Sequence, residues 1–553
     1  MRFLRLLANG LISGLFFCFL LALLVLDLNI NHRPALLDFP RLALVLFPTY
    51  GLFTALGAIL IASIYRFFVT RPMRKGFLSP RFLTLGFSLL TLIFLVIFRE
   101  NTIHFASFFI PAVRRALQFQ MAALFASAAA GLVLLYRYFH AKRRTAILGI
   151  YFAIAGAAVF LSVLLRFGYP EVERPVRFSS LQAQPISRKV TILNLEGLSF
   201  DFLFPLVNKK VLPSFAYLMN NGSWGHLSGF TPSDSAVLRR TLRTGKLPGK
   251  HRRLSDVQYR IPGFPGALEV VPRFILFRQL KQIGFLSIEP FNPPPAVKDI
   301  EMIYGEEQAV VVRTEDLSRE IREAPGTAGA PATDKLFLSL FKDLQNETAP
   351  VRRILEDALI RDRTTEERAF QARQELPPQL FFLTLDGLAD VQSYFYKYSD
   401  PADFGDIRPD EIQKFGTVIE RYYHYYDQII SKYTAAMKDE EILIVCSAYG
   451  VEPLPFWKRL VEWVLGNADI SAYHEQGPDG AVFVYGPGVA RGRSADGIRL
   501  ADIAPTVLYY AGLPVAKDMD GFARTTIFTR EFKEENPLIT ISSYEDVKVR
   551  KTP

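Results

Sequence analysis

Five long apolar stretches near the N-terminus constrain the fold of this chain more than any other feature. They lie at residues 10–30, 43–65, 82–98, 117–136 and 146–166. A helix needs about 20 apolar residues to cross a bilayer, and each stretch is near that length. No small-residue cleavage site follows the first stretch, so we interpret it as a membrane helix and not as a signal peptide. Residues 1–168 are therefore predicted to form a transmembrane domain of five helices.

Basic residues between the apolar stretches predict the orientation of this domain. They gather before the first stretch (Arg2, Arg5), between the second and third (Arg66, Arg71, Arg74, Lys75, Arg81) and between the fourth and fifth (Arg137, Lys142, Arg143, Arg144). The positive-inside rule places these three regions in the cytoplasm. Five crossings then place the rest of the chain outside the cytoplasm, on a protein of the plasma or inner membrane. Arg114 and Arg115 lie in a loop predicted to be outside, where they either mark the edge of the fourth span or contact a phosphate.

Charge and cysteine content exclude two classes of protein. The net charge is +10, but many of the basic residues lie between the apolar stretches and not on a soluble module, so we expect no nucleic-acid partner. Cys18 and Cys446 are the two cysteines of the chain. Such a pair argues against a disulfide framework and is too few for a four-cysteine zinc site.

The second half of the chain alternates short aliphatic strands with helix-like segments. "KVTILNLEG", "LFFLTLDG" and "ILIVCSAYG" each run a strand into a glycine turn, and "GAVFVYGPG" is a further strand. "PSFAYLMNNG" and "LADIAPTVLYYAGLP" are typical of helices that end at glycine. This alternation predicts an α/β domain with a mostly parallel sheet and helices on both faces. We place a linker at residues 169–188, the α/β domain at 189–535 and a tail at 536–553.

Three segments of this domain resemble the alkaline phosphatase superfamily, in particular its type I phosphodiesterase and nucleotide pyrophosphatase branch. They are "LNLEGLSFDFLFPLV", "FTPSDSAVLRRTLRTGKLPGKH", and "YHEQGPDGAVFVYGPGVARG" with the "DIAPT" helix that follows. They occur in the family's order. Five spans before an extracytoplasmic domain also resemble the architecture of lipoteichoic acid synthases and phosphoethanolamine transferases, which is an analogy of architecture alone.

The resemblance implies a site at which two divalent cations, typically zinc, activate a Ser or Thr nucleophile and stabilise a transferring phosphoryl group. Ser235 stands at the nucleophile position, nine residues before the Thr244-Gly245 pair. Ser233 is its competitor if the register is displaced by two. Glu196 stands where the family has an aspartate, and His474 keeps the last metal-binding histidine.

Four other ligand positions implied by the resemblance have lost their ligands. Ala389 and Ser393 replace an Asp and a His, and Ala448 and Tyr449 replace another Asp and His. Asp386 and Asp390 flank the first pair and are candidate substitutes. Alanine cannot bind a metal, and tyrosine is a rare ligand because the pKa of its phenol is near 10. We therefore expect the two-zinc chemistry to be lost.

Structural roles compete with functional ones at every candidate position. Glu196 could cap a helix at a strand-end turn, and Ser235 suits a helix N-cap. His474 could be an ordinary loop histidine, while His226 and His251 are candidate replacement ligands. The aromatic run "RYYHYYDQIISKY" is a half-buried helix face or a surface for glycan or lipid headgroups.

Two functional hypotheses follow from these residues. The first is a catalytically silent relative that binds a ligand or protein partners of the cell envelope. The second is an enzyme that uses Ser235 against phosphodiesters of lipid or envelope glycan. Its cofactor would be zinc or another divalent metal, and the silent relative needs none. A transporter has little support because the spans contain almost no interior charge.

Overall fold

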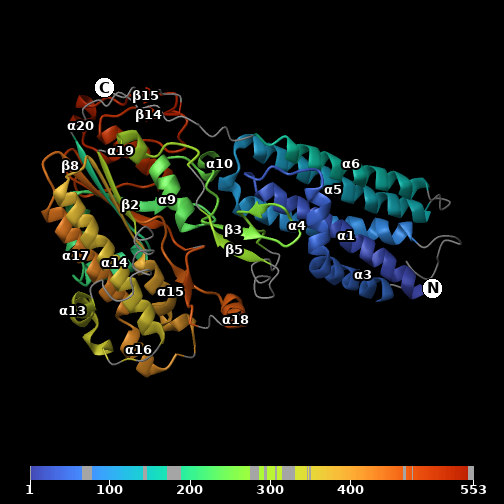
Figure 1. The fold of residues 1–553 in the computed structure, drawn as a ribbon, viewed down its shortest axis with the longest axis horizontal. Helices are drawn as coiled ribbons and strands as arrows, with labels where there is room; N and C mark the ends of the chain where they lie inside the picture. Colours follow the sequence, from blue (N-terminus) through green and yellow to red (C-terminus); the bar gives the residue numbers. More distant parts are fainter. Residues whose placement is uncertain are drawn as a thin grey trace. The chain divides into compact units, whose positions relative to one another are not determined.

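The chain folds into two compact units in the computed structural model (Figure 1). The structure describes residues 2–64, 78–140, 146–170, 188–273, 286–291, 295–305, 308–313, 330–345, 347, 350–405, 407–464, 469–475 and 477–545. One unit, the helical unit, comprises Met1–Arg174 and Pro248–Ala296, and the other, the α/β unit, comprises Pro175–Leu247 and Val297–Pro553. Most of the predicted linker at 169–188 and the end of the predicted tail lie outside the described residues.

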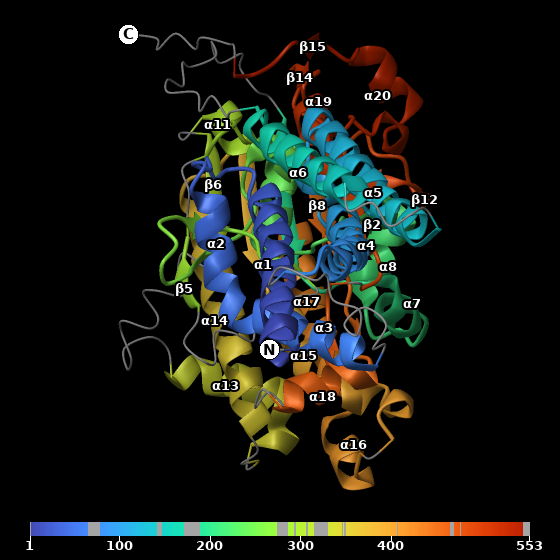
Figure 2. The ribbon, with the colours of Figure 1, turned by 90° about the vertical axis from the view of Figure 1, so that its right-hand side faces the viewer.

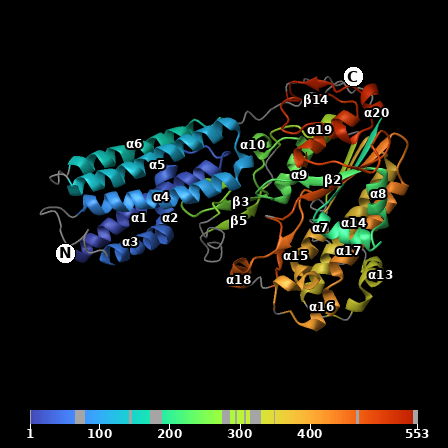
Figure 3. The same ribbon diagram turned by 180° about the vertical axis from the view of Figure 1, so that it is seen from behind.

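The helical unit contains five helices long and apolar enough to cross a membrane, at Leu4–Leu28, Asp38–Gly57, Pro80–His104, Pro111–His140 and Ala146–Phe167. Its elements are α1 (Arg2–Leu28), α2 (Asp38–Leu46), the π turn η1 (Phe47–Gly51), α3 (Leu52–Ile64), α4 (Pro80–His104), η3 (Ala106–Phe108), α5 (Pro111–His140) and α6 (Ala146–Phe167). Figures 1 and 3 show these helices side by side, and Figure 2 shows them foreshortened, with α4 close to end-on. The prediction of five membrane helices is confirmed, although the second span begins at Asp38, ahead of the predicted 43.

The segment Pro248–Ala296 packs on the ends of these helices. It contains α10 (Pro248–His251), β3 (Val257–Arg260), β4 (Ala267–Leu268) and β5 (Ser287–Pro290). The Asn29 side chain accepts from the backbone N–H groups of Glu269 and Val270, at 2.8 and 2.9 Å, and donates to the Val270 carbonyl at 2.8 Å. Asn101 accepts from the Arg273 N–H at 2.8 Å. The sequence assigns this segment to the α/β domain, whereas in the structure it is part of the helical unit.

Asp27 in α1 and Arg166 in α6 are charged residues that are buried near the ends of the helices. The Asp27 carboxylate accepts from the Gln120 amide at 2.7 Å and from the Tyr169 hydroxyl at 3.1 Å. The Arg166 guanidinium donates to the carbonyls of Leu26, Asn29 and His32. Buried charges are tolerated when hydrogen-bonded in this way, and these partners give both residues a structural role.

The α/β unit is built on an eight-stranded sheet in the order β12-β2-β11-β8-β1-β7-β6, with β13 also pairing with β2. The strands are β1 (Lys189–Leu195), β2 (Ser223–Ser228), β6 (Ala309–Arg313), β7 (Leu380–Leu385), β8 (Glu441–Cys446), β11 (Gly480–Tyr485), β12 (Arg493–Ser494) and β13 (Ile498–Arg499). Strands β6, β7, β1 and β8 are parallel, and β11 runs antiparallel between β8 and β2. The central strands are buried on both faces, as their continuous aliphatic sequences predict.

Helices cover both faces of this sheet (Figure 3). One face, with Leu193 and Leu195 of β1, packs on α7 (Phe200–Asn208), α8 (Pro213–Asn221), α13 (Ala330–Phe341), α14 (Pro350–Glu375), α15 (Gly387–Ser399), α16 (Pro409–Phe415) and α17 (Val418–Ala435). The other face, with Val190 and Ile192, packs on α9 (Ser235–Thr244), α11 (Ile300–Tyr304), α19 (Ile503–Tyr510) and α20 (Arg530–Glu535). This two-residue alternation is the period of a strand, and the predicted α/β class is confirmed.

Short elements complete the α/β unit. They are η5 (Lys342–Leu344), η6 (Pro401–Asp403), β9 (Glu452–Pro453), α18 (Phe456–Val464), β10 (Ala472–Tyr473), η7 (Leu500–Asp502), β14 (Val515–Ala516), η8 (Thr525–Ile527) and β15 (Thr540–Ile541). Strand β15 lies in the predicted tail and pairs with β14. Within the tail, the buried Tyr544 hydroxyl also donates to the Pro514 carbonyl, so the described part of the tail packs on the domain.

Candidate functional site

Three parallel strands end together at the edge of the sheet where the candidate site lies. The register pairs Leu195 of β1 with Leu385 of β7, and Asn194 with Cys446 of β8. The residues that follow these strand ends are Glu196, Asp386 and the turn Ser447–Gly450. Ligands of open α/β sheets bind at the carboxyl ends of the strands. The structure therefore brings together the three turns that the sequence identified separately.

Glu196 is the centre of this edge, and its two carboxylate oxygens have different partners. Arg239 of α9 lies 2.7 Å from Oε1, in an ion pair with almost no exposure. The Tyr449 hydroxyl lies 2.7 Å from Oε2. Glu196 itself is 3% exposed. Both carboxylate oxygens, which could otherwise bind a metal, thus have hydrogen-bond partners among the side chains of the protein.

Ser235 is the first residue of α9 and contacts this carboxylate through Tyr449. Its Oγ lies 2.9 Å from the Tyr449 hydroxyl. The helix N-cap is Asp234, whose side chain accepts from the Val237 N–H at 3.2 Å, so Ser235 does not cap the helix by its side chain. Ser233, the competing candidate, donates to the His474 carbonyl at 2.8 Å. Of the two serines, Ser235 is therefore the one with a hydrogen bond to Tyr449.

The turn that carries Tyr449 is held in place by Ser447. The Ser447 hydroxyl donates to the Tyr449 carbonyl at 2.9 Å and accepts from the Gly197 N–H at 3.1 Å. Gly197 has φ +93°, which few residues other than glycine adopt, so the turns after β1 and β8 are fixed against each other. The His474 ring stacks on the Tyr449 ring at 4.7 Å between centroids. Tyrosine at 449 and histidine at 474 therefore pack on each other.

The two candidate substitutes for lost ligands have a different partner. Asp386 and Asp390 both form ion pairs with Arg361 of α14, the first at 3.1 Å. Ser393 donates to the Ala389 carbonyl at 2.9 Å, a bond within α15. The four degenerate positions include no further carboxylate or imidazole. Arg361 and Arg239 are the site residues that sequence reasoning missed.

Histidines 226 and 251, the candidate replacement ligands, belong to different units of the chain. The exposed His226 of β2 packs on the Phe200 ring at 4.7 Å. His251 is buried in α10, which belongs to the helical unit. Among the described residues, neither belongs to a group of three or more His, Cys, Asp or Glu side chains that could hold a metal ion, so the structure adds no support for their recruitment as replacement ligands. The aromatic run in α17 is largely buried, with Tyr422, Tyr423 and Tyr426 in the core, which favours its structural interpretation.

Charge and burial set the protonation of the site. Burial raises the pKa of Glu196, but the Arg239 charge and the hydrogen bonds from Tyr449 and Arg239 together hold it below its usual range. Burial and the Glu196 charge raise the pKa of Tyr449 well above its usual range. Burial also lowers the pKa of His474. At neutral pH the site therefore holds an ionised glutamate, a neutral tyrosine and a neutral histidine.

Comparison with known proteins shows which family part of this domain resembles. Residues 190–258, which contain β1, α7, α8, β2 and α9, match the sequence profile of the family "Type I phosphodiesterase / nucleotide pyrophosphatase". The α/β domain is type I phosphodiesterase-like. The match covers residues 190–258 of this domain, and five helices of the helical unit are long and apolar enough to cross a membrane. No curated protein sequence matches the chain.

Three solved structures resemble the phosphodiesterase-like domain. Murine ectonucleotide pyrophosphatase / phosphodiesterase 5, an inactive variant in complex with AMP, is 12% identical over 62% of this chain and 100% of that chain, with a TM-score of 0.33. The alkaline phosphatase PafA is 10% identical over 63% and 100%, with a TM-score of 0.39. The phosphonate monoester hydrolase SpPMH from Silicibacter pomeroyi is 14% identical over 62% and 76%, with a TM-score of 0.33.

The residues of the phosphodiesterase-like site do not fit the divalent metals, such as zinc, that superfamily relatives use. Among the described residues, no group of three or more His, Cys, Asp or Glu side chains could hold a metal ion. Each carboxylate of the site instead has a guanidinium partner: Arg239 for Glu196, and Arg361 for Asp386 and Asp390. A metal that binds one of these carboxylates would have to displace its arginine partner. It would also need further ligands from the protein.

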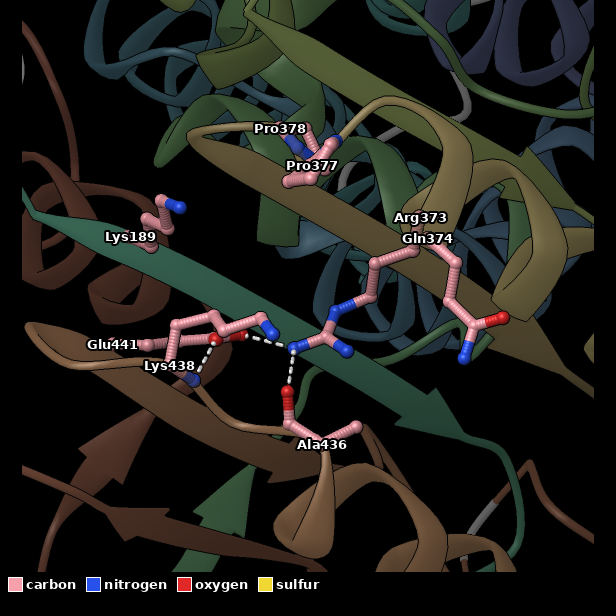
Figure 4. Close-up of a pocket in the computed structure, with 8 residues that line it drawn as sticks. All are labelled: Lys189, Arg373, Gln374, Pro377, Pro378, Ala436, Lys438 and Glu441. Atoms are coloured by element: carbon pink, nitrogen blue, oxygen red, sulfur yellow. Dashed lines mark hydrogen bonds and ion pairs between the residues drawn. The ribbon is translucent and has the colours of Figure 1, made fainter.

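A cavity of about 340 Å³ lies at the opposite end of the strands. Figure 4 shows the residues that line it: Lys189, Arg373, Gln374, Pro377, Pro378, Ala436, Lys438 and Glu441. The Glu441 carboxylate accepts from the Arg373 guanidinium at 2.6 Å, from the Lys438 N–H at 2.9 Å and from the Thr191 hydroxyl at 2.5 Å. These bonds tie the end of α14 to β1 and β8, so the charged pair in this cavity has a structural role.

Behind the site, Asp362 of α14 makes the stability of the domain depend on pH. This fully buried carboxylate accepts from the hydroxyls of Tyr422 and Tyr426, both at 2.8 Å, and from the Gly387 N–H at 3.1 Å. Burial, followed by the negative charge of Asp386, nevertheless raises the pKa of Asp362 to about 7. In the unfolded chain an aspartate has a pKa of about 3.9.

We expect stability to fall as the pH rises between these two values. The folded state binds the proton of Asp362 more tightly than the unfolded state does. The contribution of this proton to the free energy of unfolding is therefore complete below about pH 4. It is lost as the pH rises through 7, by up to about 1.4 kcal/mol per pH unit. Unfolding free energies of wild type and Asp362→Asn at pH 4, 5.5 and 7 test this. The advantage of wild type over the variant should shrink with rising pH; a constant or growing advantage contradicts the assignment.

Proposed function

We propose that this membrane-anchored, phosphodiesterase-like protein is catalytically silent and acts by binding a ligand or protein partners. The observation that carries the proposal is the pairing of Glu196 with Arg239 and Tyr449, at 2.7 Å each. In the resemblance drawn from the sequence, Glu196 is a metal ligand. Here a fixed guanidinium supplies the positive charge that a metal would otherwise supply, and it has no vacant coordination position to offer a phosphoryl oxygen.

Among the described residues, the hydrogen-bond partner of Ser235 is not a base that could activate it. The Tyr449 proton is donated to Glu196, so the Ser235 hydroxyl donates to the Tyr449 oxygen in a chain from Ser235 to Tyr449 to Glu196. The low pKa of Glu196 makes the carboxylate a weak base, and the high pKa of Tyr449 keeps the phenol protonated. An efficient general base has a pKa near the working pH, and neither Glu196 nor Tyr449 meets that condition.

Binding on the protein surface is also favoured over binding of a ligand at the candidate site. The reason is that the side chains of that site, Arg239, Glu196, Tyr449 and Ser235, already contact one another. These side chains bond to one another across the edge of the sheet, so an incoming phosphate would have to break at least one buried bond. The positive-inside pattern of the sequence supports an N-terminus in the cytoplasm and a phosphodiesterase-like domain outside it. The proposed partners are therefore proteins of the cell envelope or molecules of the membrane surface.

Metal content and phosphodiester hydrolysis of the purified full-length protein test the proposal. Wild type should hold well under one equivalent of zinc or manganese after incubation with excess metal and removal of free ions. A rebuilt variant should gain metal because it restores the ligands implied by the family resemblance and removes the competing guanidinium. It combines Ala389→Asp, Ser393→His, Ala448→Asp, Tyr449→His and Arg239→Ala.

A matched variant and one clear outcome decide this test. Glu196→Ala/His474→Ala should leave the metal content of wild type unchanged. One or two equivalents of metal in wild type that this double variant loses would overturn the proposal. Circular dichroism of each variant separates loss of metal from loss of fold.

The hydrogen-bonded chain from Ser235 to Glu196 favours one alternative function. In that alternative the protein hydrolyses or transfers phosphodiesters of lipid or envelope glycan, with Ser235 as nucleophile. Hydrolysis of bis(p-nitrophenyl) phosphate by wild type, abolished by Ser235→Ala and unchanged by Ser233→Ala, would establish it. We expect no turnover above that of Ser235→Ala, with or without added zinc.

A further inference from the structure

The short helix α18 (Phe456–Val464) of the α/β unit, drawn in orange in Figures 1 and 3, carries three exposed apolar side chains. Phe456, Leu460 and Trp463 are 74%, 52% and 65% exposed. They are spaced by four and three residues and therefore lie on one face of the helix. Large apolar side chains grouped on one exposed helix face mark a surface that another molecule or a membrane covers.

The polar side of α18 faces its own domain. The Lys458 ammonium forms an ion pair with Glu475 at 3.4 Å and lies 3.7 Å from the centre of the Tyr473 ring. The Arg459 guanidinium donates to the Asp403 carbonyl at 3.1 Å and lies 4.7 Å from the centre of the Phe404 ring. A surface helix of a globular domain has the reverse arrangement, with its apolar face on the core and its charges in water.

The acyl chains of the bilayer are an apolar environment that is always close to a membrane-anchored chain. Five spans hold the helical unit in the membrane, and the chain passes between the two units three times, after Arg174, Leu247 and Ala296. Tethering of this kind raises the effective concentration of a binding surface at its target, so a weak contact is populated. Phe and Trp beside Lys and Arg are typical of helices that lie in the headgroup region.

We propose that α18 lies in the headgroup region of the membrane that anchors the chain, with Phe456, Leu460 and Trp463 against the lipid acyl chains. The contacts of Lys458 and Arg459 fix the helix on the domain, so lipid binding by α18 would hold the phosphodiesterase-like domain at the membrane surface. This surface does not depend on whether the site around Glu196 is silent or active.

Fluorescence of full-length protein in single-copy lipid nanodiscs tests the proposal. Leu460→Cys is labelled with a solvent-sensitive fluorophore, and the buried Cys18 and Cys446 are the native thiols. In phosphatidylcholine with brominated acyl chains, the label should lose at least half of its intensity relative to ordinary phosphatidylcholine. Leu376→Cys, 75% exposed beyond the end of α14, is the matched control and should change little.

A second variant separates lipid contact from an effect of the label. Phe456→Asp/Trp463→Asp in the Leu460→Cys background should remove the quenching, and because these side chains are exposed the domain should keep its circular dichroism spectrum. Quenching at 460 no greater than at 376 would overturn the proposal. A blue shift that appears in two-copy but not in single-copy discs, without quenching by brominated lipid, would also overturn it and assign the surface to a second copy of the chain.

Discussion

Replacing Arg239 by methionine should lower the free energy of unfolding of the α/β domain by about 3–5 kcal/mol, because the variant leaves a buried carboxylate without its counter-charge. Glu196 is almost fully buried and accepts one bond from this guanidinium and another from Tyr449. Urea denaturation followed by tryptophan fluorescence measures the loss. All three tryptophans, Trp224, Trp457 and Trp463, belong to the α/β unit, so the signal reports this domain within the full-length protein.

The double variant Glu196→Gln/Arg239→Met is the control for this measurement. Removal of both charges should recover most of the stability lost in Arg239→Met, because contacting residues of opposite charge are not independent. If the two single changes have fully additive effects on the free energy of unfolding, the two charges are not coupled. The interpretation of Arg239 as the cation that takes the place of a metal would then be wrong. A rise in zinc content of Arg239→Met alone would show that the arginine also excludes metal.

Gly480→Ala should destabilise the α/β domain by about 3 kcal/mol or more and remove most of it from the soluble, folded fraction. Gly480 begins β11, beside the turn that carries Tyr449. A Cβ there would overlap the carbonyl oxygen of Ser447, which is a backbone atom with no room to move. Expression level in detergent and the midpoint of urea denaturation measure this effect.

Gly497→Ala is the matched control for the glycine substitution. Gly497 has φ +67° and open space where a Cβ would be, so alanine meets backbone strain but no atom. Its cost should be about 1–2 kcal/mol. Equal losses in the two variants would mean that loss of glycine flexibility, and not the clash with Ser447, determines the effect at 480.

The strands and turns of the site could be predicted from the sequence because their signals are local. The aliphatic runs of β1, β7 and β8 are long enough for a strand and end at polar residues before glycine, so their ends carry the candidate residues. The family resemblance assigns Glu196, Ser235 and Tyr449 to one site, and in the structure Tyr449 lies within hydrogen-bond distance of the other two. Their chemical roles stay predictions until the metal and activity measurements are made.

Arg239 could not be identified in the same way. It lies within "SAVLRRTLRTG", where three arginines follow one another on a helix and resemble a solvated face. Its position four residues after Ser235 places both side chains on one side of α9, and that spacing was the available signal. The choice among the three arginines depends on how α9 packs on the sheet, which no local pattern encodes.

The membership of residues 248–296 was also beyond the sequence signals. Their partners in the helical unit include the asparagines Asn29 and Asn101, which lie at the ends of apolar helices. At such positions asparagine is ordinarily a helix-end residue, and nothing in the sequence distinguishes one that binds the backbone of a segment about 170 or 240 residues away.

The grouping of residues 248–296 with the helical unit has a consequence for how the protein can be made and dissected. A truncated product that starts at residue 189 would retain this segment but lose Asn29 and Asn101, leaving the N–H groups of residues 269, 270 and 273 without the partners that they have in the full chain. The spans are synthesised before residues 248–296, so the helices that this segment contacts are already translated when it emerges. Strand β1 and helix α9 are also translated early, but their partners β8 and β11 follow much later. The sheet can therefore close only after the segment that belongs to the helical unit has been translated.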